Sequence, residues 1–110
     1  MDDKDLRELI GKVRDRPGLY GLDGTYYPTV TFLVGLDMGR SGRLLDGFTE
    51  WLLRRKGEES SLGWQSLTLE EAFPDAGIRH WGALAEDQQQ LAVDRLFSLL
   101  LGFLDERDSA

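Results

Sequence analysis

The apolar pattern of residues 84–104 constrains the fold more than any other feature of this sequence. Its members recur at intervals of three and four, which places them on one face of a helix of about five turns. The face comprises Leu84, Gln88, Leu91, Ala92, Leu96, Leu99 and Phe103, and it is widened by Leu100, Leu101 and Leu104. A face this wide is unstable in water, so other helices are expected to cover most of it.

Three other segments show helical spacing or helix-ending signals. Apolar positions between residues 6 and 13 share one face, and the Pro17-Gly18 pair ends that helix. Residues 44–55 repeat at the same spacing and are followed by a cationic turn and by Gly57. Ser60 or Ser61 is expected to cap the next helix, which runs through Phe73 and stops before Pro74.

Residues 29–38 are ambiguous between strand and helix. The β-branched opening Thr29-Val30-Thr31 favours a strand. However, Val30, Leu33, Val34 and Asp37 also fit one helical face, and the chain offers no second convincing strand to satisfy the backbone hydrogen bonds. We predict a helix here, with Pro28 at its first position.

Together these segments predict an all-α protein, a single domain over residues 1–110 with about five helices around one core. A chain of 110 residues fits one such domain without disulfides. The bulky residues expected in the core are Phe48, Trp51, Trp64, Phe73, Trp81, Phe97 and Phe103.

The rarest residue types exclude much chemistry. The chain has no cysteine and one histidine, His80, which rules out thiol catalysis, disulfides and any metal site with two histidines. The glycines at 18, 21 and 24 match neither a dinucleotide fingerprint nor a phosphate-binding loop. We therefore expect no metal and no cofactor.

The charge of the chain is −7, and all of this excess falls in residues 56–110, with 11 acidic and 4 basic side chains. Nucleic acids and anionic membranes attract surplus lysine and arginine, so neither is an expected partner. The polar N-terminus does not resemble a signal peptide, and apolar runs of about eight residues are too short to cross a membrane. The expected location is the cytoplasm.

The same acidic excess suggests a surface for a cationic partner. The candidate residues are Glu58, Glu59, Glu70, Glu71 and Asp75, with Tyr26 and Tyr27 as aromatic anchors. The Glu70-Glu71 pair lies in the last turns of a predicted helix, where negative charge opposes the helix dipole. Tyrosine combines a large contact area with few rotatable bonds and is enriched at binding hot spots.

Two stretches resemble known families. Arg16-Pro17-Gly18-Leu19-Tyr20 after a helix resembles the Arg-Pro-Gly-Met-Tyr signature of the GHKL ATPases, but the ATP-site motifs of those enzymes have no counterpart here. The wider layout, from this pentapeptide through Phe48-Thr49-Glu50-Trp51-Leu52 to the apolar final helix, resembles small bacterial immunity proteins of polymorphic-toxin systems. That resemblance implies a cytoplasmic protein that binds and blocks a secreted toxin domain.

Our leading hypothesis is a non-enzymatic inhibitor that binds a basic toxin domain through these acidic residues. One alternative is a small enzyme or ligand-binding domain that uses His80 and Trp81 in a pocket between helices. Another is a helical subunit that forms a homodimer through the wide apolar face of residues 91–104.

Overall fold

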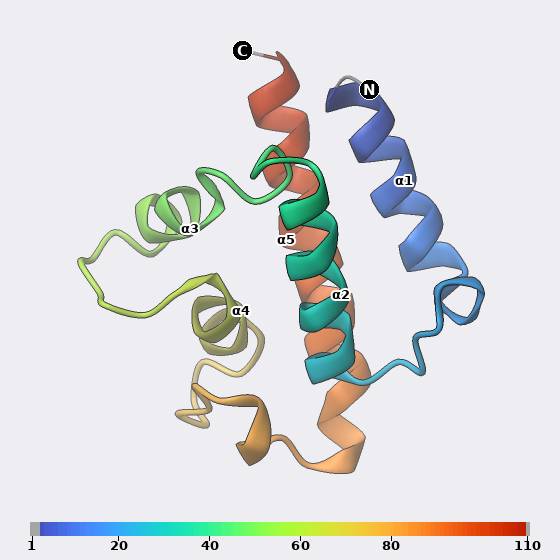
Figure 1. The fold of residues 1–110 in the computed structure, drawn as a ribbon. Coiled ribbons are helices and arrows are strands. Elements are labelled where there is room, and N and C mark those ends of the chain that lie inside the picture. Colours follow the sequence, from blue (N-terminus) through green and yellow to red (C-terminus); the bar gives the residue numbers. More distant parts are fainter. Residues whose placement is uncertain (1–2, 110) are drawn as a thin grey trace.

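Five α-helices make up the part of the chain that the structure describes, residues 3–109 (Figure 1). The structure is a computed structural model. Its helices are α1 (Asp3–Asp15), α2 (Tyr26–Gly39), α3 (Phe48–Lys56), α4 (Trp64–Ala72) and α5 (Gln89–Ser109), joined in part by the 3₁₀ turns η1 (Pro17–Tyr20), η2 (Trp81–Ala83) and η3 (Glu86–Gln88). The all-α prediction is confirmed for these residues, which contain no strand. Residues 1, 2 and 110 of the predicted domain lie outside them.

Helix α5 is the axis of the fold. It runs the height of the molecule behind α2, with α1 on one side and α3 and α4 on the other (Figure 1). Its wide apolar face is buried as expected, and Leu96, Leu100 and Leu104 are 0% exposed. Because the protein's own helices cover this face, it cannot serve as the predicted homodimer surface. Leu91, near the start of α5, is the exception at 48% exposed.

Residues 29–38 are helical, as predicted. The hydroxyls of Thr29 and Thr31 donate to carbonyl oxygens four residues earlier, at 2.8 and 3.0 Å, so these β-branched residues satisfy their polar atoms within the helix. The helix begins at Tyr26, which places Pro28 third rather than first. That position is still in the first turn, where a missing N–H costs no helical bond.

The starts of α3 and α4 differ from the predicted ones. Leu44 lies in a turn outside α3, because the carboxylate of Asp37 accepts hydrogen bonds from the N–H groups of Leu44 and Leu45 at 3.1 and 2.8 Å. Helix α4 begins after Gly63, while the Ser60 hydroxyl accepts from the Leu62 N–H at 3.1 Å and closes a local turn.

Aromatic rings fill the space between α3, α4 and α5. Phe48 is 0% exposed, and its ring centroid lies 5.3 Å from that of Phe103 and 5.9 Å from that of Trp64. Trp51 packs on Phe103 and donates its indole N–H to Glu106 at 2.8 Å. Trp81 was also expected in this core. Its side chain is 37% exposed, so that prediction was wrong.

None of the described helices is long and apolar enough to cross a membrane.

Candidate functional site

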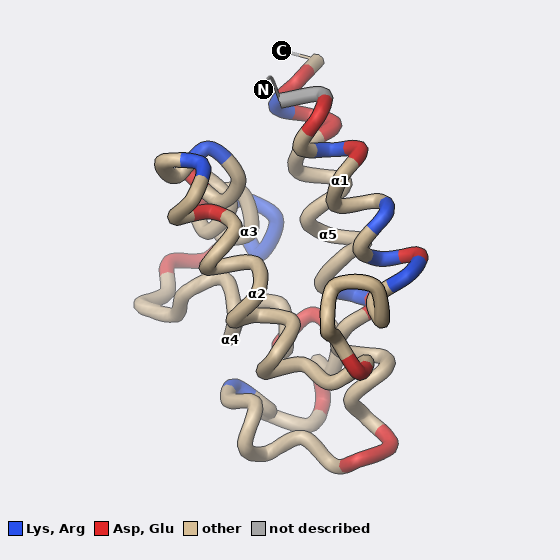
Figure 2. Tube along the Cα trace, turned by 45° about the vertical axis from the view of Figure 1, so that its right-hand side comes forward, with Lys and Arg blue, Asp and Glu red and all other residues tan. Residues whose placement is uncertain are grey.

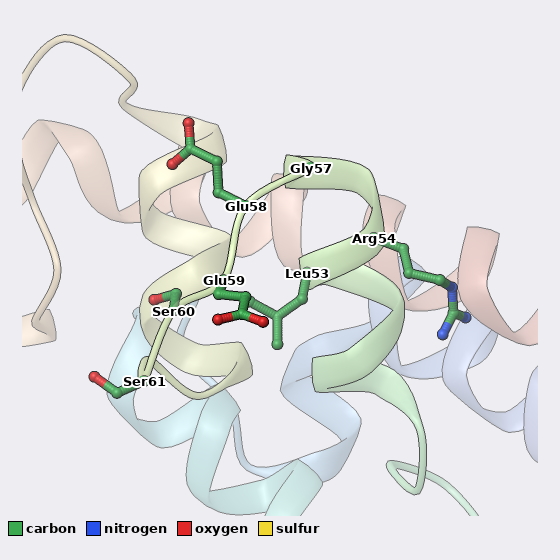
Figure 3. A pocket seen from close by; sticks show the side chains of 7 residues that line it. All are labelled: Leu53, Arg54, Gly57, Glu58, Glu59, Ser60 and Ser61. Carbon is green, nitrogen blue, oxygen red and sulfur yellow. The ribbon is translucent and has the colours of Figure 1, made fainter.

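Glu58 and Glu59 lie in the exposed loop that joins α3 to α4. They border an open hollow of about 750 Å³ whose lining also includes Leu53, Arg54 and Ser60. Figure 3 shows that the Glu58 carboxylate points away from the hollow, whereas that of Glu59 lies beside Leu53. Neither carboxylate forms an ion pair with any residue between 3 and 109.

Glu70 and Glu71 belong to an ion-pair network inside the molecule. Arg55 donates two hydrogen bonds to Glu71, at 2.8 and 3.1 Å, and this contact raises the pKa of Arg55. The ammonium of Lys56 lies 2.9 Å from Glu70, and the Nε of Arg79 lies 3.6 Å from the same carboxylate. Both carboxylates, which were predicted to contact a partner, thus already pair with cations of the same chain.

Asp75 occupies a third place, the exposed turn that follows α4. The two hollows that Glu58 and Glu70 border share no lining residue. Glu58 and Glu59 thus border one hollow and Glu70 and Glu71 the other, and Asp75 lines neither.

Tyr26 is buried, although it was predicted as a partner anchor. Its side chain is 0% exposed, and its hydroxyl donates to the carbonyl oxygen of Gln65 at 2.7 Å. Burial raises the pKa of Tyr26, so the phenol remains a hydrogen-bond donor. Tyr26 ties α2 to α4 and cannot contact a partner.

Tyr27, by contrast, belongs to an exposed group of three rings, which we call the aromatic cluster: Tyr27, His80 and Trp81. Tyr27 is 51% exposed and its ring centroid lies 4.8 Å from that of Trp81, which is 37% exposed. The exposed His80 ring stacks on Trp81, with 4.0 Å between the ring centroids. Two candidates that were separate in the sequence thus meet on one surface.

The hydrogen bond that the described residues give His80 is local. Its Nδ1 accepts from the Gly82 N–H at 3.0 Å, which caps η2 and assigns the proton of a neutral ring to Nε2. No described carboxylate or hydroxyl forms a hydrogen bond with this imidazole. These are the contacts of a turn-forming residue, without the nucleophile and orienting acid that a histidine base uses.

The cluster is held by contacts between two distant parts of the chain. The backbone N–H of Tyr26 donates to the side-chain oxygen of Gln89 at 2.8 Å, which joins the start of α2 to the start of α5. The Ser66 hydroxyl donates to the carbonyl oxygen of Arg79, which anchors the segment before Trp81 to α4. The surface is therefore positioned by the helices, although η2 itself is a short turn.

We call the region built from residues 17–36 and 80–94 the aromatic end. It contains four carboxylates, Asp23, Glu86, Asp87 and Asp94, and no lysine or arginine, although Arg16, Arg79 and Arg95 are its direct neighbours in the chain. None of these four carboxylates has an ion-pair partner among the described side chains, residues 5–109. Hydrogen bonds from Thr25 lower the pKa of Asp23. Red positions outnumber blue ones at this end, which lies away from both termini (Figure 2).

We expected Trp81 in the core because large apolar residues are usually buried, but the structure exposes it. The available signal was the absence of helical spacing around it. Residues 74–83 contain Pro74, two glycines and no apolar repeat, so nothing in that stretch placed Trp81 on a covered face.

Residues 3–109 contain no group of three histidine or acidic side chains arranged to hold a metal ion. Comparisons with models of protein families, with curated proteins and with solved structures found no match to this chain.

Proposed function

We propose that this protein is a non-enzymatic binding protein that inhibits a cationic protein partner by direct contact. The observation that carries the proposal is the aromatic cluster, two large rings and an imidazole exposed together at an acidic end. Exposed tyrosine and tryptophan side chains that lie side by side are typical of binding hot spots. The carboxylates around them would attract a basic partner and accelerate its association.

The shape of this surface favours a protein over a small ligand. Pockets for small molecules enclose most of the ligand, and neither the hollow at Glu58 nor the one at Glu70 is lined by Tyr27, His80 or Trp81. An exposed ring cluster with a charged surround matches the apolar centre and polar rim of a protein interface. The residues proposed for contact are Tyr27, His80 and Trp81, with Glu86 and Asp87 in the surround.

The partner that fits this chemistry is a basic toxin domain. The layout resemblance to immunity proteins of polymorphic-toxin systems points the same way, and an inhibitor of that kind acts in the cytoplasm of the cell that makes the toxin. Among the residues first considered for contact, Tyr27 remains in the proposed interface, while Tyr26, Glu70 and Glu71 leave it.

Affinity capture with the tagged protein tests this proposal. We expect the wild-type protein to retain a basic protein from extract of its native cell and to release it as salt rises, because the attraction is screened. The double variant Tyr27→Ala/Trp81→Ala should lose that protein. The control Leu19→Ala removes a 73% exposed apolar side chain from η1 and should retain it.

Several results would count against the proposal. The retained protein could be acidic, it could resist salt, or it could bind the double variant as well as the wild type. Each would show that the partner does not bind through the aromatic cluster or through the carboxylates around it. An extract from which the wild-type protein retains nothing specific would also contradict it.

A further inference from the structure

A cleft of about 430 Å³ lies between the ends of α3 and α4, apart from the aromatic cluster. We call it the ion-pair cleft. Its apolar lining residues are Leu52, Leu67, Phe73 and Pro74, and its charged lining residues are Arg55, Lys56, Arg79, Glu70 and Glu71. Leu52 and Leu67 are buried at 2% and 3% exposure, so the apolar part belongs to the core. The volume falls within the usual range of small-molecule sites, roughly 300–1,000 Å³.

The carboxylates of this cleft have little capacity left for a ligand. Both oxygens of Glu71 accept from Arg55, and both oxygens of Glu70 lie near the Lys56 ammonium, at 2.9 and 3.4 Å. A cationic ligand would have to displace these cations before it could pair. The occupied carboxylates therefore do not favour a cation.

Arg79 has donors to spare. A guanidinium carries five N–H groups, and the side chain of Arg79 donates no hydrogen bond to any residue between 3 and 109. Its Nε lies 3.6 Å from Glu70, beyond a good hydrogen bond, and the side chain is 65% exposed. Its backbone is fixed by the Ser66 contact and by the neighbouring Ile78, which is 8% exposed. A cation with unused donors, fixed at its backbone and exposed at its side chain, thus borders the cleft.

The local charge has the opposite sign to that of the whole chain. The lining has three cations and two carboxylates, although the chain carries −7 overall. A ligand complementary to the cleft therefore has a negatively charged hydrogen-bond acceptor and an apolar body.

We infer that the ion-pair cleft binds a small organic carboxylate, with its apolar body against Phe73 and Pro74 and its carboxylate on Arg79. The guanidinium fork matches the two oxygens of a carboxylate. Lys56, which has one donor beyond the two directed at Glu70, supplies the second positive charge. The aromatic cluster does not line the cleft, although Arg79 directly precedes His80 in the chain.

Titration with 4-phenylbutyrate tests the inference on the full chain. We expect amide chemical-shift changes at Leu52, Leu67 and Phe73, and calorimetric binding about tenfold tighter than that of the neutral 4-phenylbutan-1-ol. The cationic 4-phenylbutylamine should bind no better than the alcohol. Equal binding of acid and alcohol, or shifts confined to another surface, would overturn the inference, as would no shifts at millimolar acid.

Two variants separate a ligand site from an ion-pair network that only holds the helices. Arg79→Gln should weaken acid binding about tenfold, and the control Arg14→Gln on α1 should leave it unchanged. Glu70→Gln removes the internal competitor for Lys56 and Arg79, so it should tighten acid binding several-fold. A purely structural network predicts no such gain, and unchanged or weaker binding in Glu70→Gln would contradict the site.

Discussion

The ion-pair cleft and the aromatic end use charged side chains in opposite ways. In the cleft, Glu70 and Glu71 each contact cations of the same chain, across the gap between α3 and α4. At the aromatic end, acidic side chains such as Glu86 and Asp87 contact none of the described cations. Paired charges help to hold two helices together, whereas unpaired ones leave a field that extends into the solvent. This difference is the reason why we propose the partner surface at the aromatic end.

The adjacent residues Tyr26 and Tyr27 provide the largest test of this contrast. Tyr26→Ala should lower the free energy of unfolding by about 3–5 kcal/mol, because it empties a fully buried site. Tyr27→Ala should cost less than about 1 kcal/mol, since half of its surface is already in water. Urea denaturation of both variants measures these values. Similar losses in the two would contradict the division of roles.

Partner affinity is the next test, measured on the protein that the capture experiment identifies. Trp81→Ala should weaken binding about 30-fold, the effect of a hot-spot residue worth about 2 kcal/mol. Glu70→Gln should stay within about twofold of wild type, because its carboxylate is engaged inside the cleft. Calorimetry gives both constants. A larger loss for Glu70→Gln than for Trp81→Ala would move the partner to the cleft.

A double-mutant cycle sharpens the contrast at the level of single ion pairs. Arg55 and Glu71 should show a coupling of about 0.5–1 kcal/mol in unfolding, small because both side chains are partly exposed. The control cycle on Arg54 and Glu58, which form no ion pair among residues 3–109, should show none. Equal coupling energies in the two cycles would contradict a stabilising role for the ion-pair network.

The smallest effect concerns the exposed pair between α1 and α5. Arg7 donates to Asp105 at 2.9 Å and lowers the pKa of that carboxyl. The pair therefore stabilises the folded state above the ordinary carboxyl pKa, about 3.9, and this gain is lost as pH falls through the lower folded pKa. Asp105→Asn should cost a few tenths of a kcal/mol at pH 6, with the difference vanishing near pH 2. Thermal unfolding of both proteins across this pH range measures the effect. If the pair plays no part, the difference in stability between wild type and Asp105→Asn would not change with pH.

Most of the fold could be predicted from local patterns. The apolar faces of α1 and α5 predicted their burial. Residues 29–38 were predicted as a helix because the chain offered no second strand to pair with them. The starts of α3 and α4 could not be predicted, because they depend on a carboxylate seven residues from Leu44 and on a backbone turn at Ser60. These contacts compete with helix capping and are not visible in apolar spacing.

The candidate site was predictable only in part. Tyr27 was identified because tyrosine is common at interfaces, but nothing in the sequence distinguished it from Tyr26. Which of two neighbouring rings faces solvent depends on how α2 is rotated against α4 and α5. The acidic pairs did not show which carboxylates are neutralised, because the sequence does not indicate whether an arginine of another helix forms an ion pair with them.

The sequence by itself determined that the chain is helical and that α5 must be enclosed, because burying an apolar face gains free energy wherever that face packs. Only the tertiary structure decided which charges are neutralised and which rings remain in water. Those outcomes depend on separations of a few ångströms between residues far apart in the chain, as in the contact of Tyr27 with Trp81 or of Arg55 with Glu71.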